Sequence, residues 1–148
     1  MRTYEQFAES IGPFKGELEG LQHATPQSLS PSDWKTLERA FKAIKVMATE
    51  TAIVGHSKVL AHLLPNLVAP IDREYTFKYL LKTDYVPNDI GREWNLTRKI
   101  HEEFYYPVSD NEIFQSKAKT WMGDSKSFPW DTSLLKVIEN LVIGAMQK

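Results

Sequence analysis

Apolar residues recur every three to four positions along most of the chain, the spacing of one face of an amphipathic helix. Between positions 30 and 49 the residues at this spacing are Trp34, Leu37, Ala40, Phe41, Ile44, Met47 and Ala48. Ser30 is the expected N-cap, with Pro31 at the first helical position and Asp33 completing the start signal. The pattern predicts a helix over 30–49 that turns this face toward the core.

Similar patterns and stop signals divide the rest of the chain. Short helices are expected over 3–10 and 14–23, and further helices over 57–64, 72–82 and 89–106. Pro65 ends the helix over 57–64, and Asp72 caps the next. Ser109 and Glu112 are predicted to form a capping box for a further helix. Asp131 or Thr132 is expected to cap the last helix, which we expect to lie deep in the bundle.

The predicted fold is therefore all-α, one domain over 1–148 built as a bundle of about six to eight helices. A short hairpin at 105–108 or 128–130 is the one alternative, because aromatic and β-branched residues cluster there. We expect Phe41, Leu64 and Leu141, each central in an apolar face, to be buried.

Composition excludes several classes of protein. The 148 residues are 42% hydrophobic with a net charge of −1, so no overall field attracts nucleic acid or an anionic membrane. The absence of cysteine rules out disulfides, thiolate nucleophiles and iron–sulfur clusters. The first residues do not resemble a secretory signal, and no apolar run is long enough to span a membrane. We expect a cytoplasmic protein without cofactors.

The segment over 53–75, "IVGHSKVLAHLLPNLVAPIDREY", concentrates the residues with chemical potential. Lys58 and His62 are four positions apart and share one helix face. Pro70 keeps the next residue extended, so that Asp72 can return toward Lys58 across a helical hairpin. A Lys/Asp pair in a cleft can serve covalent or electrostatic chemistry. The alternative is that Asp72 only caps a helix and Lys58 is solvated.

Part of this segment, "VGHSKVL…LVAPIDREYTFKYL", resembles the helix-hairpin-helix DNA glycosylase superfamily. The resemblance implies a hairpin turn at Gly55 and a lysine position at Lys58, with Asp72 as the catalytic aspartate. It also implies excision of a flipped base, with DNA contacts at Gly55, His56 and Ser57. The segment is similar as well to uncharacterised bacterial proteins with the pattern G-x-SK-x-L-x-x-LLP-x-L-x-x-P-x-D, which implies no activity.

A second basic feature lies on the helix over 30–49. Lys35, Arg39, Lys42 and Lys45 share the face opposite the apolar residues. Such a stripe could follow the phosphates of a nucleic acid. The alternative is that the four side chains are an ordinary solvated helix face.

The histidines do not form a recognisable metal-ligand pattern, so no metal site is expected. His101 lies among apolar positions and is predicted to be a hydrogen-bonded core residue. Ile143, on the polar side of the last helix, would mark a homodimer contact if another apolar side chain lies beside it.

The sequence thus leaves two hypotheses of different class. The first is a non-catalytic binding or interaction module with an unknown partner. The second is a reduced glycosylase-like protein that binds DNA through the basic residues and uses Lys58 and Asp72. The second requires these two residues to face an open basic cleft, whereas the first requires only a capping role for Asp72.

Overall fold

The computed structural model describes residues 3–47 and 51–147, and within these ranges the chain forms helices without a β-strand. The α-helices are α1 (Tyr4–Ile11), α2 (Lys15–Gly20), α3 (Pro31–Ala43), α4 (Ile53–Leu63), α5 (Lys78–Leu81), α6 (Ile90–Ile100), α7 (Tyr106–Ser109), α8 (Glu112–Gly123) and α9 (Leu134–Met146). Several are continuous with each other, which leaves seven helical stretches in the described residues. The all-α prediction is confirmed.

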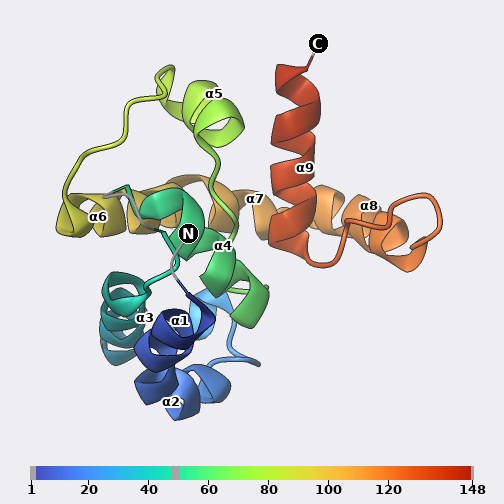
Figure 1. Ribbon diagram of the computed structural model, residues 1–148. Helices are drawn as coiled ribbons and strands as arrows, with labels where there is room; N and C mark the ends of the chain where they lie inside the picture. Colours follow the sequence, from blue (N-terminus) through green and yellow to red (C-terminus); the bar gives the residue numbers. More distant parts are fainter. Residues whose placement is uncertain (1–2, 48–50, 148) are drawn as a thin grey trace.

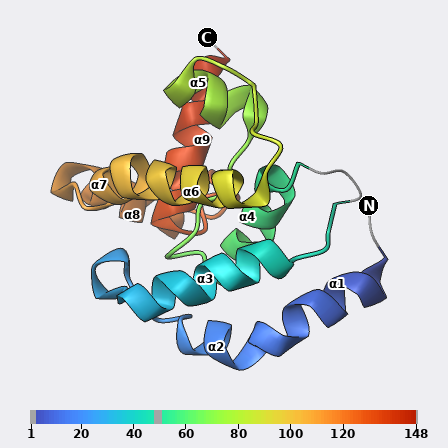
Figure 2. The same ribbon diagram turned by 90° about the vertical axis from the view of Figure 1, so that its left-hand side faces the viewer.

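Two π-helical turns are continuous with α-helices. His101–Tyr105 connects α6 to α7 in one long helical row, and Arg73–Phe77 leads into α5. Figures 1 and 2 show the row of α6 and α7 at the centre, with α1 to α3 on one side of it and α5 with α9 on the other. α4 lies between α3 and the central row.

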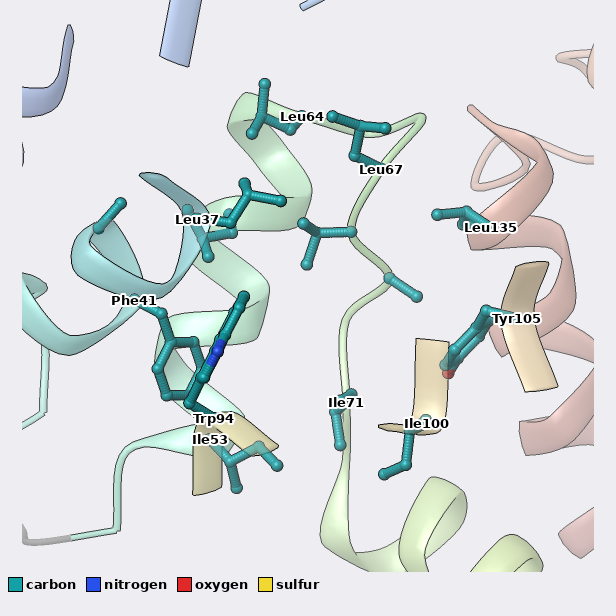
Figure 3. Packing of buried hydrophobic residues seen from close by; sticks show 14 of the residues in the cluster. Leu37, Phe41, Ile53, Leu64, Leu67, Ile71, Trp94, Ile100, Tyr105 and Leu135 are labelled. Carbon is teal, nitrogen blue, oxygen red and sulfur yellow. The ribbon is translucent and has the colours of Figure 1, made fainter. Parts of the chain in front are cut away.

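The core fills the space between α3, α4 and α6. Phe41 is fully buried, and its ring centroid lies 5.4 Å from that of Trp94, which in turn lies 6.1 Å from Trp34. Leu64 is also buried, as predicted. Figure 3 shows how the side chains of the connector after α4 extend this core toward Leu135 of α9.

That connector, residues 64–72, is the least usual part of the fold because, after a turn over 65–67, it continues without helix or strand and is nevertheless mostly buried. Leu67, Val68, Ala69 and Ile71 are all 6% exposed or less. A buried stretch without helix or strand must find other partners for its backbone polar groups. Side chains from the surrounding helices supply them, and these contacts determine the candidate site described below.

The start of α3 agrees with the prediction, since Ser30 caps it and Asp33 completes a capping box. The predicted end is wrong, because the helix stops at Ala43 and Ile44 has an extended ψ of 130°. The predicted positions Ala48 and Thr49 lie outside the described residues. Val46 and Met47 instead lie against α4, where a Cβ added to Gly55 would meet the Met47 Cγ at 2.6 Å.

Other predicted boundaries also need correction. The Ser109 hydroxyl donates to the Tyr106 carbonyl within α7, so Asn111 rather than Ser109 caps α8. Ser133, not Asp131 or Thr132, caps α9. The segment over 105–108 is helical and the segment over 128–130 is a turn, so neither forms the hairpin.

Burial in α9 also differs from the prediction. Its first half is buried, as expected for a helix deep in the bundle, with Leu135 and Ile138 both 2% exposed. Leu141 is 48% exposed, so the prediction that it is buried is wrong. The second half of α9 extends beyond the central row in Figure 1, and its apolar residues Leu141 and Met146 are exposed.

Candidate functional site

A cleft with a volume of about 500 Å³ lies between α4, the buried connector and the start of α9. One side is formed by α4, a second by the connector, and the third by the loop before α9 together with its first turns. The lining residues are Lys58, Ala61, His62, Pro65, Val68, Pro70, Pro129, Trp130, Thr132, Ser133, Lys136 and Glu139. This volume is in the usual range of small-molecule sites.

Lys58 stands at the edge of the cleft and is paired with Asp72. The Lys58 Nζ lies 3.4 Å from the Asp72 Oδ2, and the lysine side chain is 47% exposed. An exposed pair at this distance contributes at most about 1 kcal/mol, so Lys58 is free to reorient toward a ligand. The fold therefore places Asp72 beside Lys58, as predicted from the helical hairpin, although Asp72 itself does not line the cleft.

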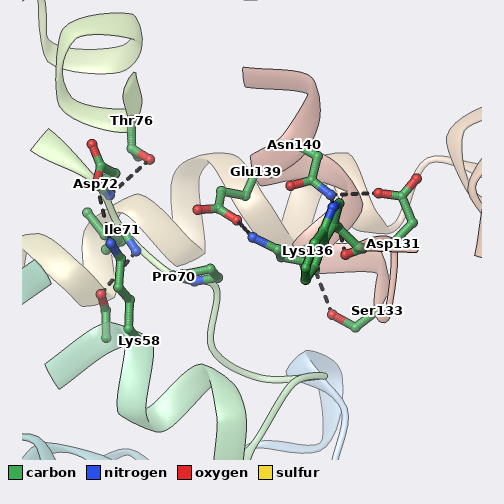
Figure 4. Close-up of polar contacts among 12 residues, drawn as sticks. Lys58, Pro70, Ile71, Asp72, Thr76, Asp131, Ser133, Lys136, Glu139 and Asn140 are labelled. Atoms are coloured by element: carbon green, nitrogen blue, oxygen red, sulfur yellow. Dashed lines mark hydrogen bonds and ion pairs between the residues drawn. The ribbon is translucent and has the colours of Figure 1, made fainter. Parts of the chain in front are cut away.

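Asp72 is also a helix cap. Its Oδ1 accepts from the Glu74 amide at 2.8 Å, and its own amide donates to the Thr76 hydroxyl. Both carboxylate oxygens are thus engaged, one by the backbone and one by Lys58. Asp72 therefore caps the helix and pairs with Lys58 at the same time, and Figure 4 shows the Lys58–Asp72 pair.

The connector is held in place by side chains from α4 and from the row of α6 and α7. The Ser57 hydroxyl of α4 accepts from the Ile71 amide at 3.0 Å. The Tyr106 hydroxyl donates to the Leu67 carbonyl at 2.7 Å. The Tyr105 hydroxyl donates to the carbonyl of Pro70 at 3.4 Å. These bonds fix the connector and therefore the position of the Lys58–Asp72 pair.

His101 makes the fourth contact with the connector and is buried, as predicted. Its Nε2 accepts from the Ala69 amide at 2.7 Å, which leaves the Nδ1 hydrogen for the Thr97 carbonyl, also at 2.7 Å. This assigns the neutral Nδ1–H tautomer. Burial lowers the pKa of His101 to about 4, although the Thr97 carbonyl favours the charged form.

The opposite side of the cleft carries a second acid–base pair. Lys136 contacts the carboxylate of Glu139, which is only 4% exposed (Figure 4). Ser133 caps α9 at this point by accepting from the Lys136 amide. The Lys136 charge is therefore committed to a buried carboxylate, whereas the Lys58 charge is only loosely held.

Trp130 lies beside this pair and is one of the most exposed large residues, with 73% of its surface accessible. Its backbone carbonyl accepts from the Thr132 amide at 3.1 Å and from the Asn140 side chain at 3.4 Å. The neighbouring Asp131 carboxylate also accepts from Asn140, at 2.6 Å. The backbone is thus anchored to α9 while the indole ring remains open to solvent.

The three residues predicted to contact DNA beside Lys58 lie inside α4. The helix begins at Ile53, so Gly55 is not in a turn before a helix starting at Ser57. Burial lowers the pKa of His56, whose Nδ1 lies 2.8 Å from the Phe41 carbonyl. Ser57 is fully buried. His56 and Ser57 therefore serve the core and the connector, not the surface.

The basic stripe of α3 is partly neutralised. Arg39 pairs with Glu17 of α2, and Lys42 pairs with Glu38 of its own helix. The side chains of Lys35 and Lys45 are exposed, but Lys45 lies after the end of α3 at Ala43, so the prediction that all four residues share one helix face is wrong. None of these four residues lines the cleft, so the structure does not join the stripe to Lys58.

Nothing in the described residues resembles a metal site, since no group of three potential ligands is close enough to hold an ion. None of the helices in these residues combines the length and apolar character needed to cross a bilayer. Comparison with family models, characterised proteins and solved structures gives no significant match.

Sequence reasoning located one side of this cleft and missed the other. Lys58 was found because it shares a short segment with Asp72. Trp130, Lys136 and Glu139 lie more than 50 positions further along the chain, and no pattern in the sequence pairs them with Lys58. The one available signal was Trp130 itself, a large apolar residue within the polar loop "GDSKSFPWDT".

Proposed function

We propose that this protein is a non-catalytic binding module whose cleft between α4 and α9 accepts an anionic ligand. The observation that carries the proposal is the loosely held ammonium group of Lys58 at the edge of a cleft of ligand size. Lys58 and Lys136 outnumber Glu139 among the charged lining residues. The positive end of the α9 dipole adds to this balance, because Ser133 and Thr132 line the cleft at the start of that helix.

The engagement of the nearby acids supports binding rather than catalysis. Asp72 is occupied by a backbone amide and by Lys58, and Glu139 by Lys136. A general base must lie within reach of a substrate proton, but Asp72 does not line the cleft and the Glu139 carboxylate is paired with Lys136. An anion can instead replace Asp72 as the partner of Lys58, which requires only a rotation of an exposed side chain.

The test is calorimetric titration with pyrophosphate at low ionic strength, where an exposed cation is least screened. Lys58→Gln should weaken binding about tenfold, the effect of losing one charged hydrogen bond. Lys45→Gln is the matched control, because it removes an equally simple exposed charge outside the cleft. Absence of binding to the folded wild-type protein, or equal losses in the two variants, would contradict the proposal.

A glycosylase-like activity on DNA is the second candidate, and the 3.4 Å approach of Lys58 to Asp72 is the observation in its favour. In that case Lys58, as the free amine, would add to C1′ of the sugar from which the base has left, and loss of water would give a Schiff base. Borohydride should then trap a covalent adduct with a duplex that contains an abasic site. Lys58→Gln should abolish the adduct, and Lys45→Gln should leave it unchanged. No adduct with the wild-type protein would eliminate this candidate.

A further inference from the structure

We infer that the anion bound in this cleft is the phosphate of a nucleotide whose base stacks on Trp130. The inference rests on the proposed function and names the class of ligand. Lys58 and Trp130 line the same cleft, so one compact molecule can contact both. A phosphate ester that carries a flat aromatic base has the two properties that these residues recognise.

The exposure of the Trp130 ring is the first observation that supports a nucleotide. An exposed indole ring loses apolar contact with the protein, and large aromatic rings normally bury most of their surface. The nearby Trp121 and Phe128 pack against each other, with ring centroids 6.1 Å apart, and Phe128 is 41% exposed. Trp130 keeps 73% of its surface exposed although its backbone carbonyl accepts two hydrogen bonds. An indole ring that is exposed on a fixed backbone is available to stack against the base of a ligand.

The shape and charge of the cleft are the second argument. Ala61, Pro65 and Val68 form an apolar part of the lining, and Lys58 with His62 forms a polar edge on one face of α4. A sugar and base can cover the apolar part while the phosphate reaches the polar edge. The volume of about 500 Å³ is enough for a mononucleotide.

The surroundings favour a mononucleotide over a nucleic acid strand. A strand needs a row of cations that follows successive phosphates. The basic stripe of α3 supplies no residue to the cleft, and its Arg39 and Lys42 are paired with glutamates. The net charge of −1 also opposes the approach of a long polyanion.

Calorimetric titration with AMP, ribose 5-phosphate and a single-stranded oligothymidylate tests the inference. AMP should bind more tightly than ribose 5-phosphate, because only AMP carries a base. Trp130→Ala should weaken AMP binding about tenfold to a hundredfold and leave ribose 5-phosphate unchanged, whereas Trp130→Phe should retain part of the difference. Tyr85→Ala is the control, since Tyr85 is 70% exposed but does not line the cleft.

The outcomes separate this inference from the function on which it rests. Equal binding of AMP and ribose 5-phosphate, or an unchanged AMP affinity in Trp130→Ala, overturns the nucleotide assignment while the anion site stands. Failure of pyrophosphate, ribose 5-phosphate and AMP alike overturns both. Oligothymidylate binding that is more than about tenfold tighter than AMP binding overturns the mononucleotide assignment in favour of a strand. Circular dichroism of each variant verifies that the protein is folded.

Discussion

Acidification should destabilise the protein through His101, the buried histidine that holds the connector. In the folded protein its Nε2 accepts from the Ala69 amide, so a proton on that nitrogen would face an N–H group. Burial lowers the pKa of His101 to about 4 from an ordinary 6.5. The unfolded chain therefore binds a proton more readily than the folded one between these two values, and stability is lost as the pH falls through that window.

The size of the effect follows from the two pKa values. Between about pH 7 and pH 5 the difference in proton binding removes about 2 kcal/mol of unfolding free energy, and about 3 kcal/mol once the pH is below both values. That is a large share of the 5–15 kcal/mol typical of a folded domain, taken as an order of magnitude. His56, whose pKa burial also lowers, adds a contribution of the same sign.

Urea unfolding at constant ionic strength measures this loss, with the variant His101→Gln as the comparison. A glutamine oxygen can still accept from the Ala69 amide but does not titrate in this range. The wild type should therefore lose about 2 kcal/mol more than the variant between about pH 7 and pH 5. The protection factor of the Ala69 amide, which corrects its exchange rate for the intrinsic pH dependence of amide exchange, should fall over the same range. Identical pH dependence in the two proteins would refute the role assigned to His101.

Three further changes test the core, the cap and a buried acid. Phe41→Ala should lower the unfolding free energy by about 3–5 kcal/mol, and an unchanged urea midpoint would mean that the core is misplaced. Asp72→Ala should cost about 1 kcal/mol while Asp72→Ser retains most of the stability, and equal midpoints for Ala and wild type would remove the capping role. Burial raises the pKa of Glu93, which accepts from the Ala52 and Ile53 amides. The protonated form of Glu93 therefore stabilises the folded protein, and this stability is lost as the pH rises from 4.5 through the raised pKa. Glu93→Gln does not titrate, so its urea midpoints measured across this pH range should not show that loss.

The helices were predictable because their signals are local. Ser30, Pro31 and Asp33 stand within four positions, and each acts on the same few amides of α3. The end of that helix was not predictable in the same way. After Ala43 the chain is held by distant groups, since the Lys45 amide donates to the Ser10 hydroxyl and Val46 lies against Gly55. Tertiary contacts of this kind override local helix preference.

The errors in α8 and α9 have related causes. A capping box needs a free hydroxyl at the start of a helix, but the Ser109 hydroxyl is used by α7, which the sequence pattern did not separate from its neighbours. Leu141 belongs to an apolar face that is wider than the surface available to cover it. Periodicity shows which side chains share a face, but it cannot show how far the packed neighbours extend.

The candidate site illustrates the same limit at a larger scale. Lys58 and Asp72 meet because the connector between them passes through the core, and it can do so only because Ser57, His101, Tyr105 and Tyr106 satisfy its backbone groups. From the sequence, His101 was predicted to be a core histidine and Ser57 to be part of a DNA-binding turn. Their shared role depends on where α4 and α6 meet the connector, which no local spacing encodes.

The buried connector also links the stability of the fold to the cleft. Val68 and Pro70 line the cleft and flank Ala69, whose amide is held by His101. Any opening that releases Ala69 therefore displaces part of the cleft lining and the support of Asp72. A ligand that binds only the closed form stabilises that form in proportion to the logarithm of its concentration. The contacts that allow a segment without helix or strand to cross the core are thus the same contacts that keep the cleft in a binding-competent shape.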